Sequence, residues 1–95
     1  MDMIVSFADK YTEAFFSDGT CPPRWRTFAK VAARKLDMVD AAVALGDLRS
    51  PPGNRLEPLK GDRKGQHSIR INDQWRVCFR WTDEGPEVVE ITDYH

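Results

Sequence analysis

The hydrophobic pattern of the chain changes its period once, near the middle of the sequence. Apolar residues recur mainly at helical spacing before Pro51-Pro52-Gly53 and alternate with polar residues after it. This proline- and glycine-rich triplet is too short for an interdomain linker and marks a loop between elements. The pattern predicts a single domain over residues 1–95, of the α+β class.

The first half predicts a short strand followed by helices. Met3–Phe7 is β-branched and apolar, which favours a strand. Asp9 suits the N-cap of a short helix and Gly19 suits its C′ position. From Arg24 onward an apolar stripe at helical spacing predicts a longer helix that packs against a sheet. The stripe comprises Trp25, Phe28, Val31 or Ala32, Leu36 and Val39. The basic residues expected mainly off the stripe are Arg26, Lys30, Arg34 and Lys35.

The second half predicts a three-stranded antiparallel meander. The runs 68–71, 75–81 and 88–91 each read as a strand, the first two with a period of two. Asn72-Asp73 suits a tight two-residue turn and 83–86 a second turn. We expect Met3–Phe7 to complete the sheet, with the helices packed on one face. The opposite face would collect Arg70, Arg76 and Arg80.

Charge is distributed unevenly along the sequence. Residues 55–80 hold seven Lys or Arg and three acids, whereas residues 81–95 hold five acids and no Lys or Arg. The net charge of −1 conceals this polarity. A basic segment of this kind predicts a polyanionic partner.

Composition narrows the class of protein. The chain is 41% hydrophobic and 31% charged, as in soluble globular domains. Its short apolar runs predict no transmembrane span, and its first residues do not resemble a secretory signal. Cys21 and Cys78 show no motif spacing, which favours reduced thiols and a cytoplasmic location.

The basic face suggests a reaction. Arginines offer planar bidentate donors to phosphate, and the Lys60–Lys64 loop adds further positive charge. Tyr94 can stack on an unpaired base, and His95 titrates near neutrality, which suits a general acid. These groups fit cleavage of RNA by its own 2′-hydroxyl, in which cations stabilise the charge on the phosphate. Such chemistry needs no metal, and we expect no cofactor.

Several motifs resemble a known family. They are the run Asn54–Arg63, then Ser68-Ile69, Trp75-Arg76 and the final Asp93-Tyr94-His95. In combination they resemble the HigB toxins, especially GraT-type members, of the RelE/ParE superfamily of bacterial toxin–antitoxin systems. The likeness extends over nearly the whole chain and begins at Met3-Ile4-x-Ser6-Phe7.

The resemblance implies a fold, an activity and partners. The fold is a compact RelE-like domain, β-α-α-β-β-β, with a mostly antiparallel sheet. The activity is that of a ribosome-dependent endoribonuclease, an mRNA interferase that cuts mRNA in the ribosomal A site and inhibits translation. The partner is a HigA-type antitoxin with a helix-turn-helix domain, and operator DNA is bound only through the antitoxin complex.

The resemblance also implies site residues. Lys60 and Arg76 would hold the scissile phosphate, while Asp93, Tyr94 and His95 would line the catalytic end. Further residues expected to contact RNA are Arg55, Arg63, Lys64, Arg70 and Arg80.

One position departs from the family. Several HigB proteins carry a histidine near the Pro-Leu-Lys run, where this chain has Glu57. Glu57 is either a general base for the 2′-hydroxyl or a partner of a neighbouring arginine such as Arg55. Asp93 is also open to two interpretations, since it either orients His95 or ends the strand. A bulge or twist near Thr92 would be needed for the last three residues to line one cleft.

Two other functions compete with RNA cleavage. A ParE-like toxin would act on a protein target such as DNA gyrase and cut no RNA. A non-catalytic nucleic-acid or protein-binding module would use the same charges for binding alone. The basic face that ends in Tyr94-His95 favours the nuclease, because a toxin with a protein target does not need it.

Overall fold

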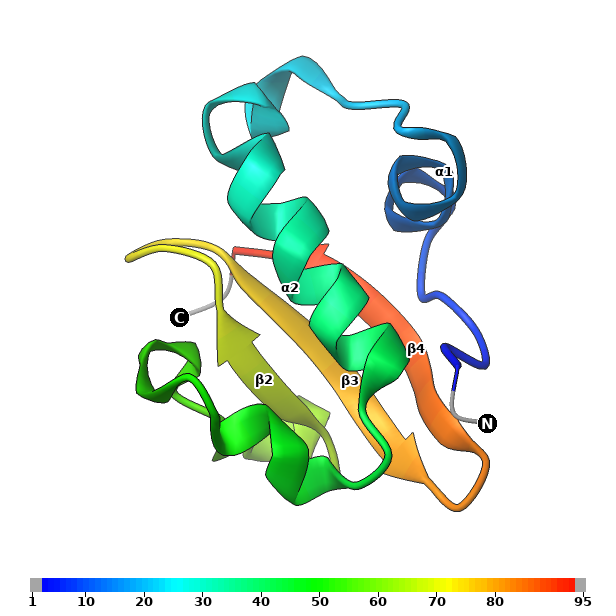
Figure 1. The fold of residues 1–95 in the computed structure, drawn as a ribbon, viewed down its shortest axis with the longest axis vertical. Helices are drawn as coiled ribbons and strands as arrows, with labels where there is room; N and C mark the ends of the chain where they lie inside the picture. Colours follow the sequence, from blue (N-terminus) through cyan, green and yellow to red (C-terminus); the bar gives the residue numbers. More distant parts are fainter. Residues whose placement is uncertain (1–2, 94–95) are drawn as a thin grey trace.

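A computed structural model describes residues 3–93 as two helices packed against one four-stranded sheet (Figure 1). The helices are α1 (Lys10–Asp18) and α2 (Ala29–Ala41). The strands are β1 (Glu57–Pro58), β2 (His67–Arg70), β3 (Arg76–Thr82) and β4 (Gly85–Thr92). Four short 3-10 segments are η1 (Pro23–Phe28), η2 (Leu45–Arg49), η3 (Pro52–Asn54) and η4 (Gly61–Arg63). The strands pair antiparallel in the order β1-β2-β3-β4.

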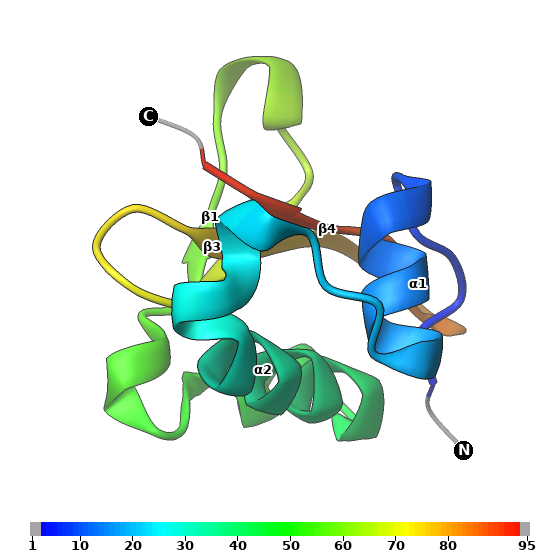
Figure 2. The same cartoon turned by 90° about the horizontal axis from the view of Figure 1, so that it is seen from above.

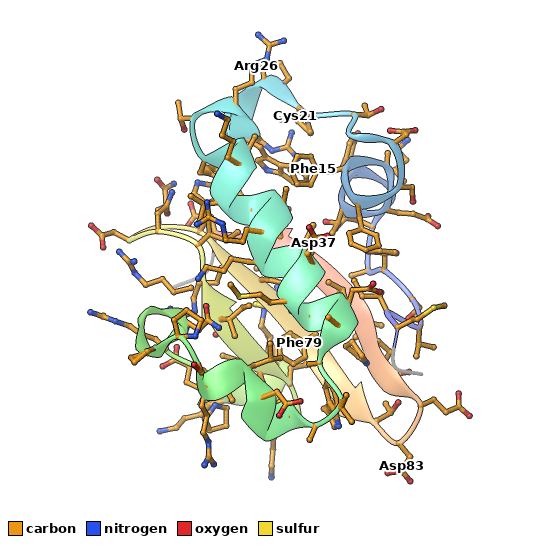
Figure 3. All side chains as sticks on the ribbon, viewed as in Figure 1. Phe15, Cys21, Arg26, Asp37, Phe79 and Asp83 are labelled. Carbon is orange, nitrogen blue, oxygen red and sulfur yellow. The ribbon has the colours of Figure 1, made fainter. Side chains whose placement is uncertain are left out.

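The core lies between α2 and one face of the sheet, which confirms the predicted α+β class. Figure 2 shows α2 on one side of the sheet and the loop that carries η4 on the other. The stripe residues Trp25, Phe28, Ala32, Leu36 and Val39 are all buried. They meet the buried strand residues Ile69, Val77, Phe79, Val89 and Ile91 in one cluster, and Figure 3 marks Phe79 beneath α2. Among the described residues, no helix is long and apolar enough to span a membrane.

The caps of α1 confirm the predicted boundaries. The Asp9 carboxylate accepts hydrogen bonds from the Thr12 backbone N–H (2.7 Å) and the Thr12 hydroxyl (3.0 Å). Gly19 adopts a left-handed conformation (φ 79°), and its N–H donates to the Phe15 carbonyl. Thr12 is fully buried and accepts from the Ile91 N–H (3.2 Å), so the cap also ties α1 to β4.

The N-terminal segment departs from the prediction of a regular strand. It follows the outer edge of β4, but its β-bridge is a single parallel pair, Phe7 with Val89. The ladder is interrupted because β4 carries an extra residue there, and the Val88 N–H donates to the Ser6 side chain instead (2.9 Å). The fourth strand of the sheet is therefore β1.

That extra residue is a β-bulge at Val88. Arg80 pairs with Glu87 and Cys78 pairs with Glu90, so β4 has one residue more than β3 in this interval. Val88 has φ 47°, a left-handed conformation that is unusual for a β-branched residue. The bulge lies upstream of Thr92, which pairs in register with Arg76.

The connection from β2 to β3 is longer than the predicted two-residue turn. Arg70 pairs with Arg76, which leaves a five-residue loop, 71–75. Asn72 organises this loop, because its side-chain oxygen accepts from the N–H groups of Gln74 (2.8 Å) and Trp75 (2.7 Å). The predicted turn at 83–86 is present but shorter: Asp83-Glu84 links β3 to β4, and Gly85 and Pro86 already pair within β4.

Lys35 is buried, although it was expected mainly off the apolar stripe. Its ammonium group donates to the side-chain oxygen of Asn54, which is itself fully buried. The Asn54 amide donates in turn to the carbonyls of Leu48 (3.1 Å) and Ser50 (3.3 Å). Burial lowers the pKa of Lys35, and the nearby charges of Arg34 and Arg70 lower it further. These hydrogen bonds hold the segment that connects α2 to β1 against the helix.

The sheet face opposite the helices is less open than alternation predicts. Cys78 points to that face yet is completely buried. Burial is the largest cause that raises the pKa of its thiol, to about 11. Cys78 is therefore protonated at neutral pH.

We expect Asn54→Ala to destabilise the fold by about 2–4 kcal/mol. The substitution leaves the buried Lys35 ammonium and the carbonyls of Leu48 and Ser50 without their hydrogen-bond partner. Urea unfolding followed by circular dichroism would measure this loss. Asp37→Ala, at an exposed position of α2 (Figure 3), is the matched control and should change the stability by less than about 0.5 kcal/mol. Equal stability of wild type and Asn54→Ala would contradict the proposed fastening role.

We expect iodoacetamide to spare Cys78 in the folded protein. At pH 8, a thiol with a pKa of about 11 is ionised to about one part in a thousand, and burial also blocks the reagent. Mass spectrometry of a Cys21→Ser variant should show no modification until denaturant is added, and reaction should then be rapid. Rapid labelling of the native variant would show that the thiol is accessible and ionisable.

Candidate functional site

Strand pairing gathers the candidate residues on the sheet face opposite α2. Directly paired residues of adjacent strands point to the same face. The register therefore aligns one row of four residues, Glu57, Ser68, Cys78 and Glu90. The next row on the same face consists of Arg70, Arg76 and Thr92. We call these two rows, with the 59–66 loop beside them, the polar face.

Arg76 is anchored from several sides on the polar face. Its Nε donates to the Ser68 hydroxyl (2.7 Å), and one Nη donates to the backbone carbonyl of Arg55 (2.8 Å). The same Nη lies 3.4 Å from a carboxylate oxygen of Glu57. Only 15% of the Arg76 side chain is exposed to solvent. A guanidinium held from several sides is preorganised to bind an anion.

The backbone at Arg55 makes this anchoring possible. Arg55 has a left-handed conformation (φ 47°) directly after the buried Asn54. The turn presents the Arg55 carbonyl to Arg76, while the Arg55 side chain stays exposed. Neither Asn54 nor Ser68 was assigned a role from the sequence. For Ser68, the available signal was its alternation with Ile69, which places it on the polar face.

Four arginines of the polar face and its borders are each paired with a carboxylate. The pairs are Arg63–Glu90 (3.1 Å), Arg70–Asp73 (2.5 Å), Arg76–Glu57 (3.4 Å) and Arg80–Glu87 (3.7 Å). Two of the acids come from β4, within the acidic stretch of the sequence. The face is therefore less positive than the basic segment alone indicates. The prediction that Glu57 pairs with an arginine is confirmed. Its partner among the described residues is Arg76, whereas Arg55 was the example expected from the sequence.

The 59–66 loop borders the polar face and carries the lysines. It rises on the side of the sheet away from α2 (Figure 2). Leu59 is buried at its base, and the Leu59 N–H donates to the Gln66 carbonyl (2.9 Å). Lys60 and Lys64 are exposed and form no ion pair with other described residues.

Gly65 lets this loop approach β3 closely. A Cβ at this position would lie 2.7 Å from a terminal nitrogen of Arg80. The Gly65 backbone has φ 93°, which also favours glycine. The loop and Arg80 thus form one continuous border of the polar face.

The C-terminal candidates are described in part. Ile91 faces the core, and Asp93 is exposed at the end of β4, where it accepts a hydrogen bond from the Gln74 side chain (2.8 Å). This contact connects Asp93 to the 71–75 loop. Tyr94 and His95 lie outside the described residues.

The arrangement favours electrostatic chemistry over thiol chemistry. The thiol of Cys78 lies in the first row of the polar face, but it is buried and protonated, so it is no nucleophile there. Within residues 3–93, no three His, Cys, Asp or Glu side chains gather closely enough to hold a metal ion. Of the groups that remain, the anchored guanidinium and the exposed lysines suit the binding of a phosphate diester, whereas the carboxylates compete with it for the arginines.

Sequence comparisons identify relatives across the whole chain. Residues 5–95 match the family model described as the RelE-like toxin of the type II toxin–antitoxin system HigB. Toxin HigB-1 of Vibrio cholerae is 45% identical over 85 residues, which cover 85% of this chain and 86% of that protein. Endoribonuclease HigB of Proteus vulgaris is 30% identical over 93 residues, which cover 98% of this chain and 100% of that protein.

Solved structures support the same fold. The YoeB-YefM complex from Staphylococcus aureus matches with a TM-score of 0.60 at 18% identity, covering 100% of this chain and 98% of that one. The YoeB/ParE toxin from Agrobacterium tumefaciens matches with a TM-score of 0.56 at 20% identity, covering 98% and 99%. The predicted resemblance is confirmed: the chain belongs to the HigB family of RelE-like toxins from type II toxin–antitoxin systems.

Proposed function

We propose that this protein is an endoribonuclease toxin that cleaves mRNA in the ribosomal A site and so inhibits translation. Its relative from Proteus vulgaris, similar over nearly its whole length, is named as an endoribonuclease. The observation that carries the proposal is the anchored Arg76 guanidinium on a face bordered by exposed lysines. We further propose that the toxin acts in the cytoplasm and is neutralised by a HigA-type helix-turn-helix antitoxin, through which alone it reaches operator DNA.

The proposed reaction uses the nucleophile of the RNA itself. A base removes the proton of the 2′-hydroxyl, the 2′-oxygen bonds to phosphorus, and the bond from phosphorus to the 5′-oxygen breaks. An acid protonates the departing 5′-oxygen, which leaves a 2′,3′-cyclic phosphate and a 5′-hydroxyl. Arg76 and Lys60 would stabilise the charge that grows on the phosphate. His95 would be the acid, and Asp93 and Tyr94 would line the same end of the site.

Glu57 is the member of the polar face that fits this scheme least well. Its carboxylate lies 3.4 Å from the guanidinium that would bind the phosphate. The pair is half-exposed on the Glu57 side, and such pairs contribute about 0–1 kcal/mol, so a phosphate can displace it. We therefore propose that Glu57 holds Arg76 in the free protein and lowers the intrinsic activity of the site.

The remaining basic residues would hold the RNA away from the scissile bond. Arg55 and Lys64 are exposed and form no ion pair with the described residues, so they would contact backbone phosphates directly. Arg63, Arg70 and Arg80 would first have to release their carboxylate partners.

We expect Arg76→Ala to lower cleavage of ribosome-bound mRNA by about 10²–10³-fold, because it removes a preorganised donor to the phosphate. A variant that lacks His95 should also lose most of its activity. The assay is primer extension on message with a defined A-site codon. Arg26→Ala, at a solvent-exposed position of η1 far from the polar face (Figure 3), serves as the control.

Thermal melting of each variant separates a loss of chemistry from a loss of fold. Intact message at an excess of wild-type toxin would overturn the proposed reaction and favour a protein target. Full toxicity of both variants would favour a module that only binds.

We expect Glu57→His to raise the rate of mRNA cleavage by about tenfold or more, because it frees Arg76 and adds a group that titrates near neutrality. Glu57→Gln, which removes the charge but keeps the shape, should stay within about tenfold of wild type. Single-turnover cleavage on ribosomes measures both. A large loss with Gln would instead identify Glu57 as the general base, and no gain with His would argue against the attenuating role.

A further inference from the structure

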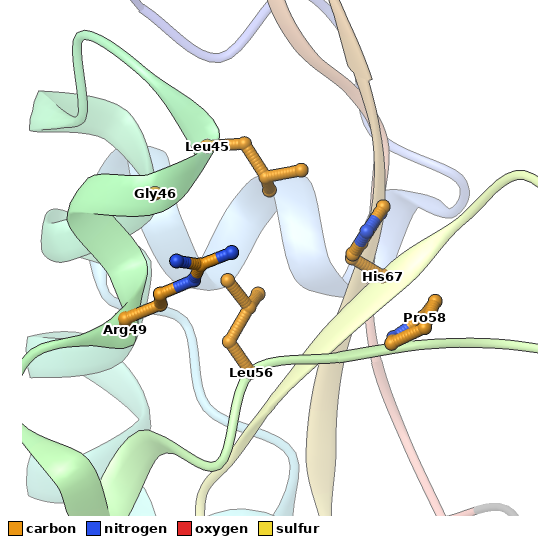
Figure 4. Close-up of a pocket in the computed structure, with 6 residues that line it drawn as sticks. All are labelled: Leu45, Gly46, Arg49, Leu56, Pro58 and His67. Carbon is orange, nitrogen blue, oxygen red and sulfur yellow. The ribbon is translucent and has the colours of Figure 1, made fainter.

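A pocket of ≈ 160 Å³ opens at the β1 edge of the sheet, on the side of the helices (Figure 4). Its lining residues are Leu45, Gly46, Arg49, Leu56, Pro58 and His67. His67 pairs with Phe79, a core residue, so it points to the helix side of the sheet, away from Arg76. The pocket is thus separate from the polar face.

The pocket contains two nitrogen groups that lack a partner within residues 3–93. The His67 Nδ1 is buried and forms no hydrogen bond there. Arg49 forms no ion pair with the described carboxylates, and Figure 4 shows it extending from η2 between Leu45 and Leu56 toward the wall that His67 forms. A buried polar atom without a partner is unfavourable, so the His67 Nδ1 favours a ligand that satisfies it, and the exposed Arg49 at the mouth of the pocket adds a positive charge.

The chemistry of the lining selects the ligand. A guanidinium donates to a carboxylate, and the His67 Nδ1 does so in the tautomer that carries the ring proton on this nitrogen. The side chains of Leu45, Leu56 and Pro58 supply apolar walls that fit the methylene groups of a side chain. The volume suits one side chain, whereas a phosphodiester would bring a sugar and a base with it.

We propose that this pocket receives an aspartate or glutamate side chain of the partner antitoxin, with its carboxylate between Arg49 and His67. The inference rests on the proposed antitoxin partnership and is independent of RNA cleavage. The occupant is a protein because the pocket faces away from the polar face, where RNA would bind, and because membership in a toxin–antitoxin family provides an antitoxin as partner. Docking here would leave Arg76 uncovered in the complex.

The test is the affinity of the toxin for its cognate antitoxin, measured by isothermal titration calorimetry. Arg49→Glu should weaken binding by about tenfold or more, because it places two carboxylates together. Arg49→Gln and His67→Phe, which keep the size of the side chain, should each weaken it by a smaller factor. Arg26→Glu makes the same charge change outside the pocket and should leave the affinity within about twofold of wild type.

Two further measurements make the result decisive. Arg49→Glu should melt like wild type and cut ribosome-bound mRNA at the wild-type rate, so a failure of the proposed nuclease activity would not affect the binding result. The ring signals of His67 in NMR spectra should shift on addition of the antitoxin and not with millimolar inorganic phosphate.

Unchanged affinity of Arg49→Glu would overturn the proposal. Equal weakening by Arg26→Glu would also overturn it, because this would indicate general charge attraction. A His67 shift with phosphate but not with the antitoxin would identify a small-anion site and would likewise reject the antitoxin as the occupant.

Discussion

The buried contact between Lys35 and Asn54 is the constraint on which the rest of the structure depends. It joins the middle of α2 to the end of the segment that connects α2 to β1. The Asn54 amide also donates to two carbonyls of that segment. The next residue, Arg55, turns into a left-handed conformation and presents its carbonyl to Arg76. One buried amide therefore transmits the position of the helix to the polar face. Burial of a charged lysine is unfavourable, and the lowered pKa of Lys35 reflects this. The hydrogen bond to Asn54 compensates for the water that the ammonium loses.

The sequence predicts the elements whose signals are local. The caps at Asp9 and Gly19 and the buried apolar stripe follow from spacing within a few residues, and the structure has them, although Trp25 and Phe28 lie in the 3-10 segment η1 and α2 begins only at Ala29. Strand alternation placed Arg70 and Arg76 on one face, and the family motifs added candidate roles for Lys60 and Arg76. Lys35 could not be placed in this way, because its partner Asn54 lies nineteen positions further along the chain. The loop 71–75 was missed for a different reason: its length follows from the pairing of Arg70 with Arg76, and this register is a tertiary property.

The distribution of charge on the surface also depends on tertiary structure and could not be predicted from the sequence. Along the sequence, the basic segment and the acidic end are separate, which favours a strongly positive surface. In the fold, β4 returns beside β3 and brings Glu87 and Glu90 to Arg80 and Arg63. A polyanion must then exchange with internal carboxylates, and this exchange favours ligands that offer several phosphates at once. A neutral hydroxyl and a carbonyl hold Arg76 in addition to Glu57, so it would keep its position if a ligand displaced Glu57.

The bulge at Val88 decides which side chains the end of β4 offers to each side of the sheet. Because β4 has one extra residue there, Pro86 and Val89 both face inward, although they are an odd number of positions apart. If the same residues ran through this segment with regular alternation and no bulge, every side chain beyond Glu87 would exchange faces: Glu90 and Thr92 would turn toward α2, and Val89 and Ile91 toward solvent. The bulge therefore keeps Glu90 and Thr92 on the polar face. A homologue with a strand of the same length but no bulge here would present a different set of groups on that face, even with the rest of its sequence unchanged.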